Sequence, residues 1–234
     1  MADITLRGEL WDNDSADVLR WWGWRDITAP MDIAAALEAA GGEDVTLLIN
    51  SPGGDMTVGT EIRSMLRRYP GKTTALFQGY GASAATLAAT GCQVIQSEPG
   101  ALLCYHNPSG AAEGDYRDMR RSAQALRNAR DCILEVYTAR SSAKTKEELM
   151  ALMDQNIWIS PTQAKDYGLI DEIVGLSGKE EDPAAFVAAV GGRIRLTASM
   201  REQYQAYIVG HRAEEVRQKQ VRRTLARLRA LAEF

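Results

Sequence analysis

Two side chains in this sequence have the chemistry of a nucleophile and its base. Ser83 stands in the segment Gly-Tyr-Gly-Ala-Ser-Ala-Ala (79–85), where glycines permit a sharp turn and small neighbours leave room for a substrate carbonyl. His106 ends an apolar run, and the other histidine, His211, lies in the charged C-terminal part of the chain. A histidine within hydrogen-bond reach of a serine hydroxyl activates it for attack on a carbonyl. Taken singly, Ser83 also fits a helix N-cap and His106 a structural strand end.

A second motif supplies groups that could stabilise the resulting negative charge. Asn50-Ser51-Pro52-Gly53-Gly54 directly follows the apolar run 45–50. Two glycines let the backbone adopt positive φ and approach a ligand closely, and backbone N–H groups in such a turn stabilise an oxyanion. The same five residues also fit a plain strand-to-helix turn.

These motifs need a scaffold, and the hydrophobic pattern predicts strands that alternate with helices. We expect strands at 3–8, 45–50, 73–80, 93–98 and 101–107, and helices at 31–40, 57–69, 81–91, 113–142 and 145–155. The runs at 45–50 and 73–80 are typical of strands buried on both faces. Thr145 and Glu148 are spaced as a capping box. The alternation predicts an α/β fold with a largely parallel sheet.

The composition limits the partners and the compartment. The chain has 234 residues, a net charge of −4 and a sequence pI of about 5.4, so a global basic field for nucleic acid is absent. We read no secretory signal at the N-terminus, and the least charged run, 71–94, is too weakly apolar for a membrane span. Cys92, Cys104 and Cys132 lack metal-type spacing, so we expect reduced packing residues of a cytoplasmic protein, with no metal and no cofactor.

The two ends of the chain differ from its centre. Trp21, Trp22 and Trp24 cluster near the N-terminus, and they fit either a cap over the core or a subunit contact. We expect a catalytic domain at 1–176, a linker or small extension at 177–198 and a charged helical tail at 199–234. The tail is locally basic and fits either a solvated helix or a partner-binding arm.

Four motifs in family order resemble the ClpP peptidase family, within the broader crotonase-like fold. The resemblance spans about residues 3–176 and is carried by LLINSPGGDM (47–56), QGYGASAAT (78–86), LLCYHNP (102–108) and WISPTQAKDYGLIDEIV (158–174). It is nearest to the branch encoded by tailed phages and prophages, the prohead proteases. The resemblance implies a ClpP/crotonase-like fold of repeated ββα units, with a projecting handle helix at 113–142 and a C-terminal helical tail.

The resemblance also implies a role for each matching residue. Ser83 would be the acylating nucleophile and His106 the general base, then the general acid. The N–H groups of Gly54 and Ala84 would form the oxyanion hole. The substrate-binding residues would be Gly53, Asn107 and Pro108, with the segment 107–114 beside an extended peptide.

One position departs from the family pattern. The family's third triad member is an acid, and the matching position here holds Asn156, with Asp154 two residues earlier. Register favours Asn156, whose carbonyl oxygen can orient an imidazole but cannot stabilise an imidazolium with a full charge. A local shift would bring in Asp154 instead. A dyad helped by water, or a weakened enzyme, is the remaining possibility.

The function that the resemblance implies is a serine endopeptidase that matures phage capsid or scaffold proteins. It would act as a homo-oligomer, a heptameric ring or stacked rings, in the host cytoplasm or in a virion assembly intermediate. One alternative is a housekeeping ClpP subunit that works with an ATPase. Another is a catalytically weakened scaffolding protein of the same fold, which the amide at Asn156 keeps open.

Overall fold

Parallel strands form the centre of the computed structural model, which describes residues 1–175. Six strands follow the order β2-β1-β3-β4-β5-β7, and β6 pairs with the end of β4, so the sheet has seven strands. The predicted linker and tail, 177–198 and 199–234, lie outside the described residues. The strands are β1 (Ala2–Leu10), β2 (Ile27–Thr28), β3 (Val45–Gly54), β4 (Thr73–Ala82), β5 (Val94–Ser97), β6 (Leu102–Cys104) and β7 (Glu172–Ile173).

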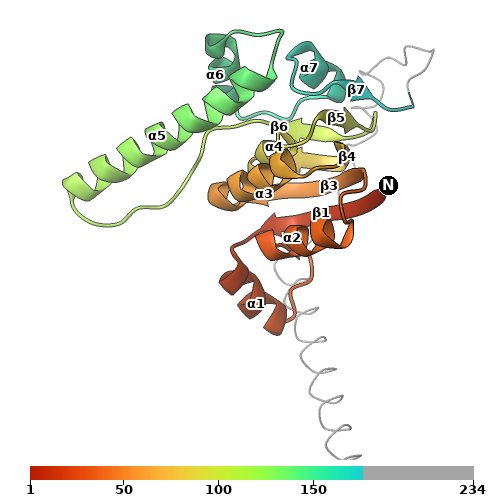
Figure 1. Ribbon diagram of the computed structural model, residues 1–234. Helices are drawn as coiled ribbons and strands as arrows, with labels where there is room; N and C mark the ends of the chain where they lie inside the picture. Colours follow the sequence, from red (N-terminus) through yellow and green to blue (C-terminus); the bar gives the residue numbers. More distant parts are fainter. Residues whose placement is uncertain (176–234) are drawn as a thin grey trace, which may run out of the picture. The chain divides into compact units, whose positions relative to one another are not determined.

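Helices connect the strands, as the alternating pattern predicts. They are α1 (Asn13–Trp21), α2 (Pro30–Ala39), α3 (Met56–Arg68), α4 (Ala84–Ala89), α5 (Tyr116–Arg140), α6 (Lys146–Gln155) and α7 (Pro161–Asp166) (Figure 1). The predicted capping box is confirmed, because the Thr145 hydroxyl accepts from the Glu148 N–H while the Glu148 carboxylate accepts from the Thr145 N–H. None of the helices in residues 1–175 is long and apolar enough to cross a membrane.

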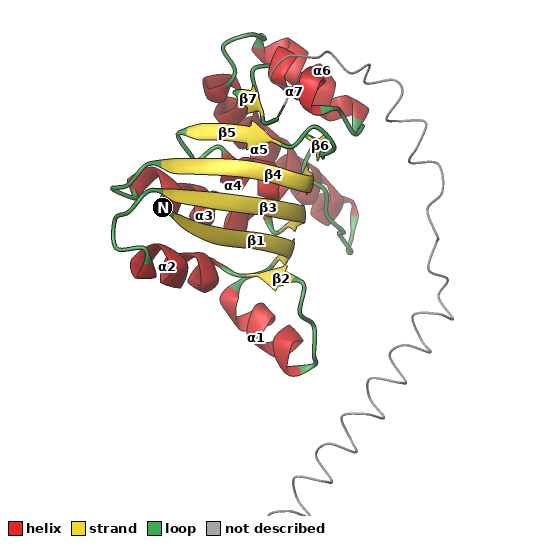
Figure 2. Ribbon diagram, turned by 90° about the vertical axis from the view of Figure 1, so that its right-hand side faces the viewer, coloured by secondary structure: helices red, strands yellow, loops and turns green. Residues whose placement is uncertain are grey.

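The sheet is covered by helices on one face. Figure 2 views it from the opposite face, with α3 and α4 behind β3 and β4. Burial alternates along β1 accordingly: Ile4, Leu6, Gly8 and Leu10 are buried, whereas Thr5, Arg7 and Glu9 are exposed. The expectation that 45–50 is buried on both faces is therefore wrong for one face, on which Leu48 is only half-buried.

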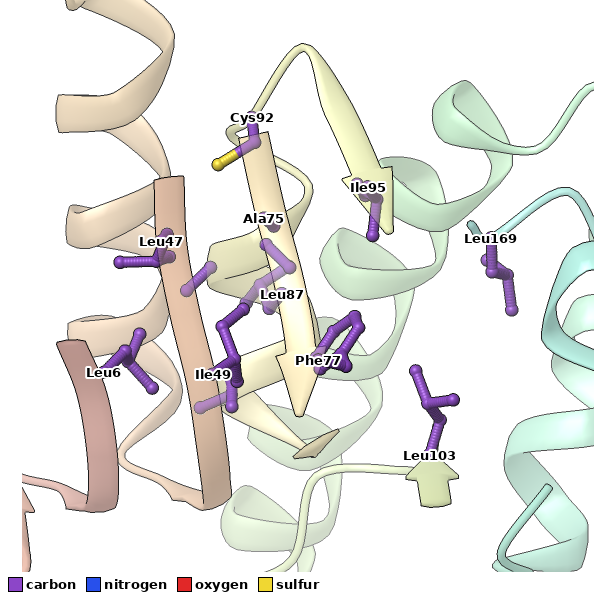
Figure 3. Close-up of a cluster of buried hydrophobic side chains, with 14 of the residues drawn as sticks. Leu6, Leu47, Ile49, Ala75, Phe77, Leu87, Cys92, Ile95, Leu103 and Leu169 are labelled. Atoms are coloured by element: carbon purple, nitrogen blue, oxygen red, sulfur yellow. The ribbon is translucent and has the colours of Figure 1, made fainter. Parts of the chain in front are cut away.

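One apolar cluster joins the sheet to its helices. It includes Leu6, Leu47, Ile49 and Phe77 from the strands and Leu87 from α4 (Figure 3). Phe77 is fully buried. Because these side chains leave consecutive parallel strands toward the same helices, the core fixes the relative positions of the strand ends that carry the motifs.

Two surface features differ from the expectations. Trp21, Trp22 and Trp24 are 80%, 65% and 51% exposed, so the interpretation as a cap over the core is wrong. Cys132 is exposed and is therefore not a packing residue, whereas Cys92 and Cys104 are buried free thiols. Helix α5 projects beyond the sheet, as the resemblance implied for a handle, and only its C-terminal half buries residues, among them Ile133 and Tyr137 (Figure 1).

Candidate active site

Ser83 occupies a strained position between β4 and α4. Its backbone has φ 56° and ψ −129°, in the left-handed half of the map that a side chain rarely adopts. Such a conformation costs on the order of 1–3 kcal/mol and persists only where the surroundings enforce it. Ser83 holds the N-cap position of α4, but in the described part of the chain its side chain makes no capping hydrogen bond.

Hydrogen bonds that involve β6, α4 and α5 support this turn. The Ser83 N–H donates to the carbonyl of Cys104 in β6 at 3.0 Å, and the Ser83 carbonyl accepts from the Thr86 hydroxyl at 2.7 Å. The Thr86 and Tyr137 hydroxyl oxygens are 2.7 Å apart. Since the Thr86 proton is given to Ser83, Tyr137 donates to Thr86. Burial raises the pKa of Tyr137, which keeps this donor protonated.

Sequence reasoning missed both Thr86 and Tyr137. Thr86 has a weak sequence signal, since a hydroxyl three residues after a turn residue often bonds back to its carbonyl. Tyr137 has no local signal, because it lies 51 residues away from Thr86 in α5. The handle helix is thus tied to the nucleophile turn by a buried hydrogen bond.

The glycine pair at the end of β3 lies against the same turn. A Cβ on Gly53, which has φ +88°, would lie 2.5 Å from the Ala82 carbonyl oxygen and 2.6 Å from the Ser83 Cβ. A Cβ on Gly54 would lie 2.3 Å from the Leu10 carbonyl oxygen. Real Cβ contacts are not this short, so only glycine lets β3 approach β1 and the Ser83 turn.

Ser51 occupies the N–H group of one of the two glycines. Its buried hydroxyl donates to the Gly8 carbonyl at 2.6 Å and accepts from the Gly53 N–H at 3.0 Å. The Gly53 N–H is therefore already used. Ala84 is the first residue of α4, whose leading N–H groups have no partner within the helix. Gly54 and Ala84 remain the two candidate donors to an oxyanion.

Ser83 and His106 open onto one pocket of about 360 Å³. Gly54 and Ala84 line its polar side, and Leu126, Ala129, Ile133 and Tyr137 of α5 line its apolar side. Pro108 is also a lining residue, whereas Gly53, Asn107, Asp154 and Asn156 are not. Across residues 1–175 no group of three or more His, Cys, Asp or Glu side chains could hold a metal ion.

The strand register explains why His106 reaches this pocket. Ala82 of β4 is paired with Cys104 of β6, so Ser83 and His106 both leave the carboxyl ends of neighbouring parallel strands. Between residues 1 and 175 no hydrogen bond joins the Ser83 hydroxyl to the imidazole. Instead, His106 Nδ1 lies 2.7 Å from the carbonyl oxygen of Asn107.

A backbone bridge brings Asp154 and Asn156 to the His106 side of the site. Leu103 and Ile159 exchange two N–H···O bonds, of 3.0 and 2.8 Å, which align the end of α6 with β6. Asn156 ends α6 in the left-handed conformation, with φ 49° and ψ 47°. Its amide oxygen lies 3.9 Å from Cys104 Sγ, whereas Asp154 accepts a 2.7 Å hydrogen bond from the Asn107 amide. The described residues thus show neither side chain bonded to His106.

Comparison with known proteins decides the family. The model of the family described as Clp protease matches residues 28–177, more than half of the chain. The chain belongs to the Clp protease family. Its members are serine peptidases, and Ser83 and His106 stand in motifs by which the sequence resembled that family.

Individual relatives agree with this assignment. The chain is 31% identical over 202 residues to ATP-dependent Clp protease proteolytic subunit 1 of Leifsonia xyli, covering 82% of this chain and 97% of the relative. It is 31% identical over 135 residues to the subunit 1 protein of Streptomyces avermitilis, covering 56% of this chain and 61% of that relative. An asparagine-to-aspartate mutant of ClpP1 from Listeria monocytogenes has the same fold, with a TM-score of 0.59 and 21% identity over 74% of this chain and 90% of that one. The predicted ClpP-like α/β fold is therefore confirmed.

Proposed function

We propose that this chain is a serine endopeptidase in which Ser83 attacks the carbonyl carbon of a peptide bond. The observation that carries the proposal is the strained Ser83 turn, which opens onto the same pocket as His106. A hydroxyl with no hydrogen-bond partner among residues 1–175, on a residue in a costly backbone conformation, fits a nucleophile better than a cap. The positive end of the α4 dipole adds little to the stabilisation of the developing negative charge, since the helix has only six residues.

The steps follow from the groups present. His106 Nε2 accepts the Ser83 hydroxyl proton as Oγ bonds to the carbonyl carbon, and the N–H groups of Gly54 and Ala84 stabilise the oxyanion. His106 then gives that proton to the leaving amine, which releases the C-terminal product and leaves an acyl-serine. Water, deprotonated by His106, hydrolyses the ester and regenerates Ser83.

The substrate in this proposal is an extended peptide beside residues 107–114. The resemblance favours this placement, and Pro108 and Ser109 line the pocket next to His106. Main-chain pairing to such a segment accepts many sequences, while the apolar wall from α5 favours an apolar side chain near the cleaved bond.

A serine-directed fluorophosphonate tests the proposal. The wild type should be labelled, Ser83→Ala should not, and His106→Gln should be labelled at least roughly a thousandfold more slowly, as losses of triad bases are elsewhere. Ser142→Ala, at an exposed serine that does not line the pocket, should label like the wild type. A folded wild type that stays unlabelled as an oligomer would favour the scaffolding alternative.

The biological setting is a separate part of the proposal. The family resemblance suggests a heptameric ring or stacked rings in the cytoplasm, and the matched relatives are named as subunits of ATP-dependent proteases. We propose maturation of capsid or scaffold proteins, which the exposed tryptophan segment at 21–24 and the basic tail favour, because both differ from the usual cellular enzyme. Cleavage of a capsid or scaffold protein without nucleotide supports this role. Cleavage of folded protein only with an added unfoldase ATPase and ATP supports the housekeeping role.

A further inference from the structure

The ring orientation of His106 is set by a backbone oxygen. Its Nδ1 lies 2.7 Å from the carbonyl oxygen of Asn107, and a carbonyl oxygen can only accept. A hydrogen bond of this length therefore places the proton on Nδ1 and leaves the lone pair on Nε2. This is the tautomer that a base toward Ser83 requires, and the carbonyl here stands where a carboxylate stands in a Ser-His-Asp triad.

Asn107 is in turn held by its neighbours. The residue before a proline is confined to extended backbone, so Pro108 restricts the peptide that carries this carbonyl. The Asn107 amide nitrogen donates a 2.7 Å hydrogen bond to Asp154 Oδ1, a short bond to an ionised acceptor. The amide oxygen of Asn107 is buried and, in the part of the chain that is described, has no partner. The bond to Asp154 is thus the one polar anchor of this side chain in the described residues.

Asn156 has a different local role. It is the residue in the left-handed conformation that ends α6, a position at which asparagine is tolerated. Its amide oxygen accepts a weak hydrogen bond from the Cys104 thiol, at 3.9 Å. Burial raises the pKa of that thiol, so it stays a neutral, weak donor. Asn156 is thus accounted for by the helix end.

We propose that the Asn107 main-chain carbonyl is the acceptor that orients His106, and that Asp154 is a positioning residue acting on it through the Asn107 side chain. This inference rests on the proposed peptidase function. In this arrangement neither Asn156 nor Asp154 is a direct partner of the imidazole, and support reaches the ring in two steps. The carboxylate fixes the amide, and the carbonyl of the same residue fixes the ring.

Substitutions at Asp154 separate a hydrogen-bond role from a charge role. Asn at this position still presents an oxygen to the Asn107 amide, so Asp154→Asn should keep kcat within about threefold. Asp154→Leu removes the acceptor and should lower kcat roughly tenfold to a hundredfold with KM nearly unchanged. Asn107→Leu should lower kcat by a similar factor. Asp166→Leu, a like substitution at an exposed acid in α7, is the control and should match the wild type.

The pH profile adds a readout that a purely structural role does not move. If Asp154 touched the imidazole directly, its neutralisation in Asp154→Asn would lower the apparent pKa of the acidic limb of kcat/KM by about one unit or more. Support through Asn107 predicts a shift below roughly half a unit. An Asp154→Asn variant that loses as much kcat as Asp154→Leu, or shifts by a full unit, overturns the proposal.

Nitrogen-15 NMR of the imidazole tests the same inference without catalysis. In a His211→Gln background His106 is the one histidine of the chain. We expect the Nδ1–H tautomer at a pH where the ring is neutral, and a mixture of tautomers in Asp154→Leu. An unchanged tautomer there overturns the positioning role. If the wild type shows this tautomer but is not labelled by fluorophosphonate, the proposed function fails and the positioning contact stands.

Discussion

Replacing Gly53 by alanine tests whether the glycine pair exists to let β3 reach the nucleophile turn. Its φ is +88°, and an added Cβ would lie 2.5 Å from the Ala82 carbonyl oxygen, 2.6 Å from the Ser83 Cβ and 2.8 Å from the Ala84 nitrogen. Two of these atoms are backbone, so they cannot move without shifting β4 or α4. The substitution therefore acts on the Ser83 turn directly.

Two terms contribute to the expected loss of stability. A left-handed conformation costs an L-residue roughly 1–2 kcal/mol relative to glycine. Forcing a methyl group into a packed site adds about 1–3 kcal/mol. The free energy of unfolding should therefore fall by roughly 2–5 kcal/mol, which lowers Tm by about 5–15 °C for a domain of this size.

Gly41→Ala is the matched control. Gly41 has φ +58°, and a Cβ there would meet nothing within 4 Å. It should lose only the conformational term, roughly 1–2 kcal/mol. The difference between the two variants isolates the steric term at the site.

Thermal melts and fluorophosphonate labelling give the two readouts. At a temperature where both variants are folded, Gly53→Ala should label at least about tenfold more slowly than the wild type, because an ångström-scale displacement of a nucleophile has effects of this size or larger. Gly41→Ala should label like the wild type. If Gly53→Ala melts and labels like Gly41→Ala, the close approach described here does not position Ser83.

Three further outcomes follow from the structure. Tyr137→Phe removes the donor to Thr86 and should lower the free energy of unfolding by about 1 kcal/mol in denaturant titrations. It should also slow Ser83 labelling, because Thr86 is then less firmly held. Unchanged labelling contradicts a link from α5 to the turn. Asn156→Asp should preserve or raise peptidase activity, since aspartate also tolerates the left-handed helix end; a tenfold loss argues against this. Burial raises the pKa of Cys92 to about 12 from 9.0, so Cys92 should resist thiol reagents in the folded protein while Cys132 reacts. The contribution of Cys92 to stability should be lost as pH rises from 9.0 toward 12, because the unfolded thiol ionises first. If a Cys92→Ala variant loses the same stability at alkaline pH, other groups cause that loss.

Much of the scaffold could be predicted from local pattern. The apolar runs at 45–50 and 73–80 became the first part of β3 and most of β4, and the segment 57–69 became α3 to within a residue or so. The capping box of α6 was readable because its two bonds lie within four residues. Such features depend on neighbours in the sequence, so the sequence contains the information that decides them.

The exposed faces could not be predicted in the same way. Leu48 lies in a continuous apolar run, yet it is half-buried, because helices in the described region cover only the other face of the sheet. Trp21 ends α1, Trp22 and Trp24 follow it, and all three are exposed, since periodicity does not say what a short helix and the loop after it pack against.

The candidate chemistry can be read from local residues: Ser83 in a glycine-flanked turn, His106 after an apolar strand, and the order of motifs that identifies the family. How these groups are held depends on packing between distant segments. The φ of Ser83 depends on contacts with Cys104 and Thr86, and the orientation of His106 depends on Asn107, which Asp154 anchors from 47 residues away. A hydrogen bond across that separation forms only once β6 and α6 have packed together, so the residues near Asn107 in the sequence do not predict it.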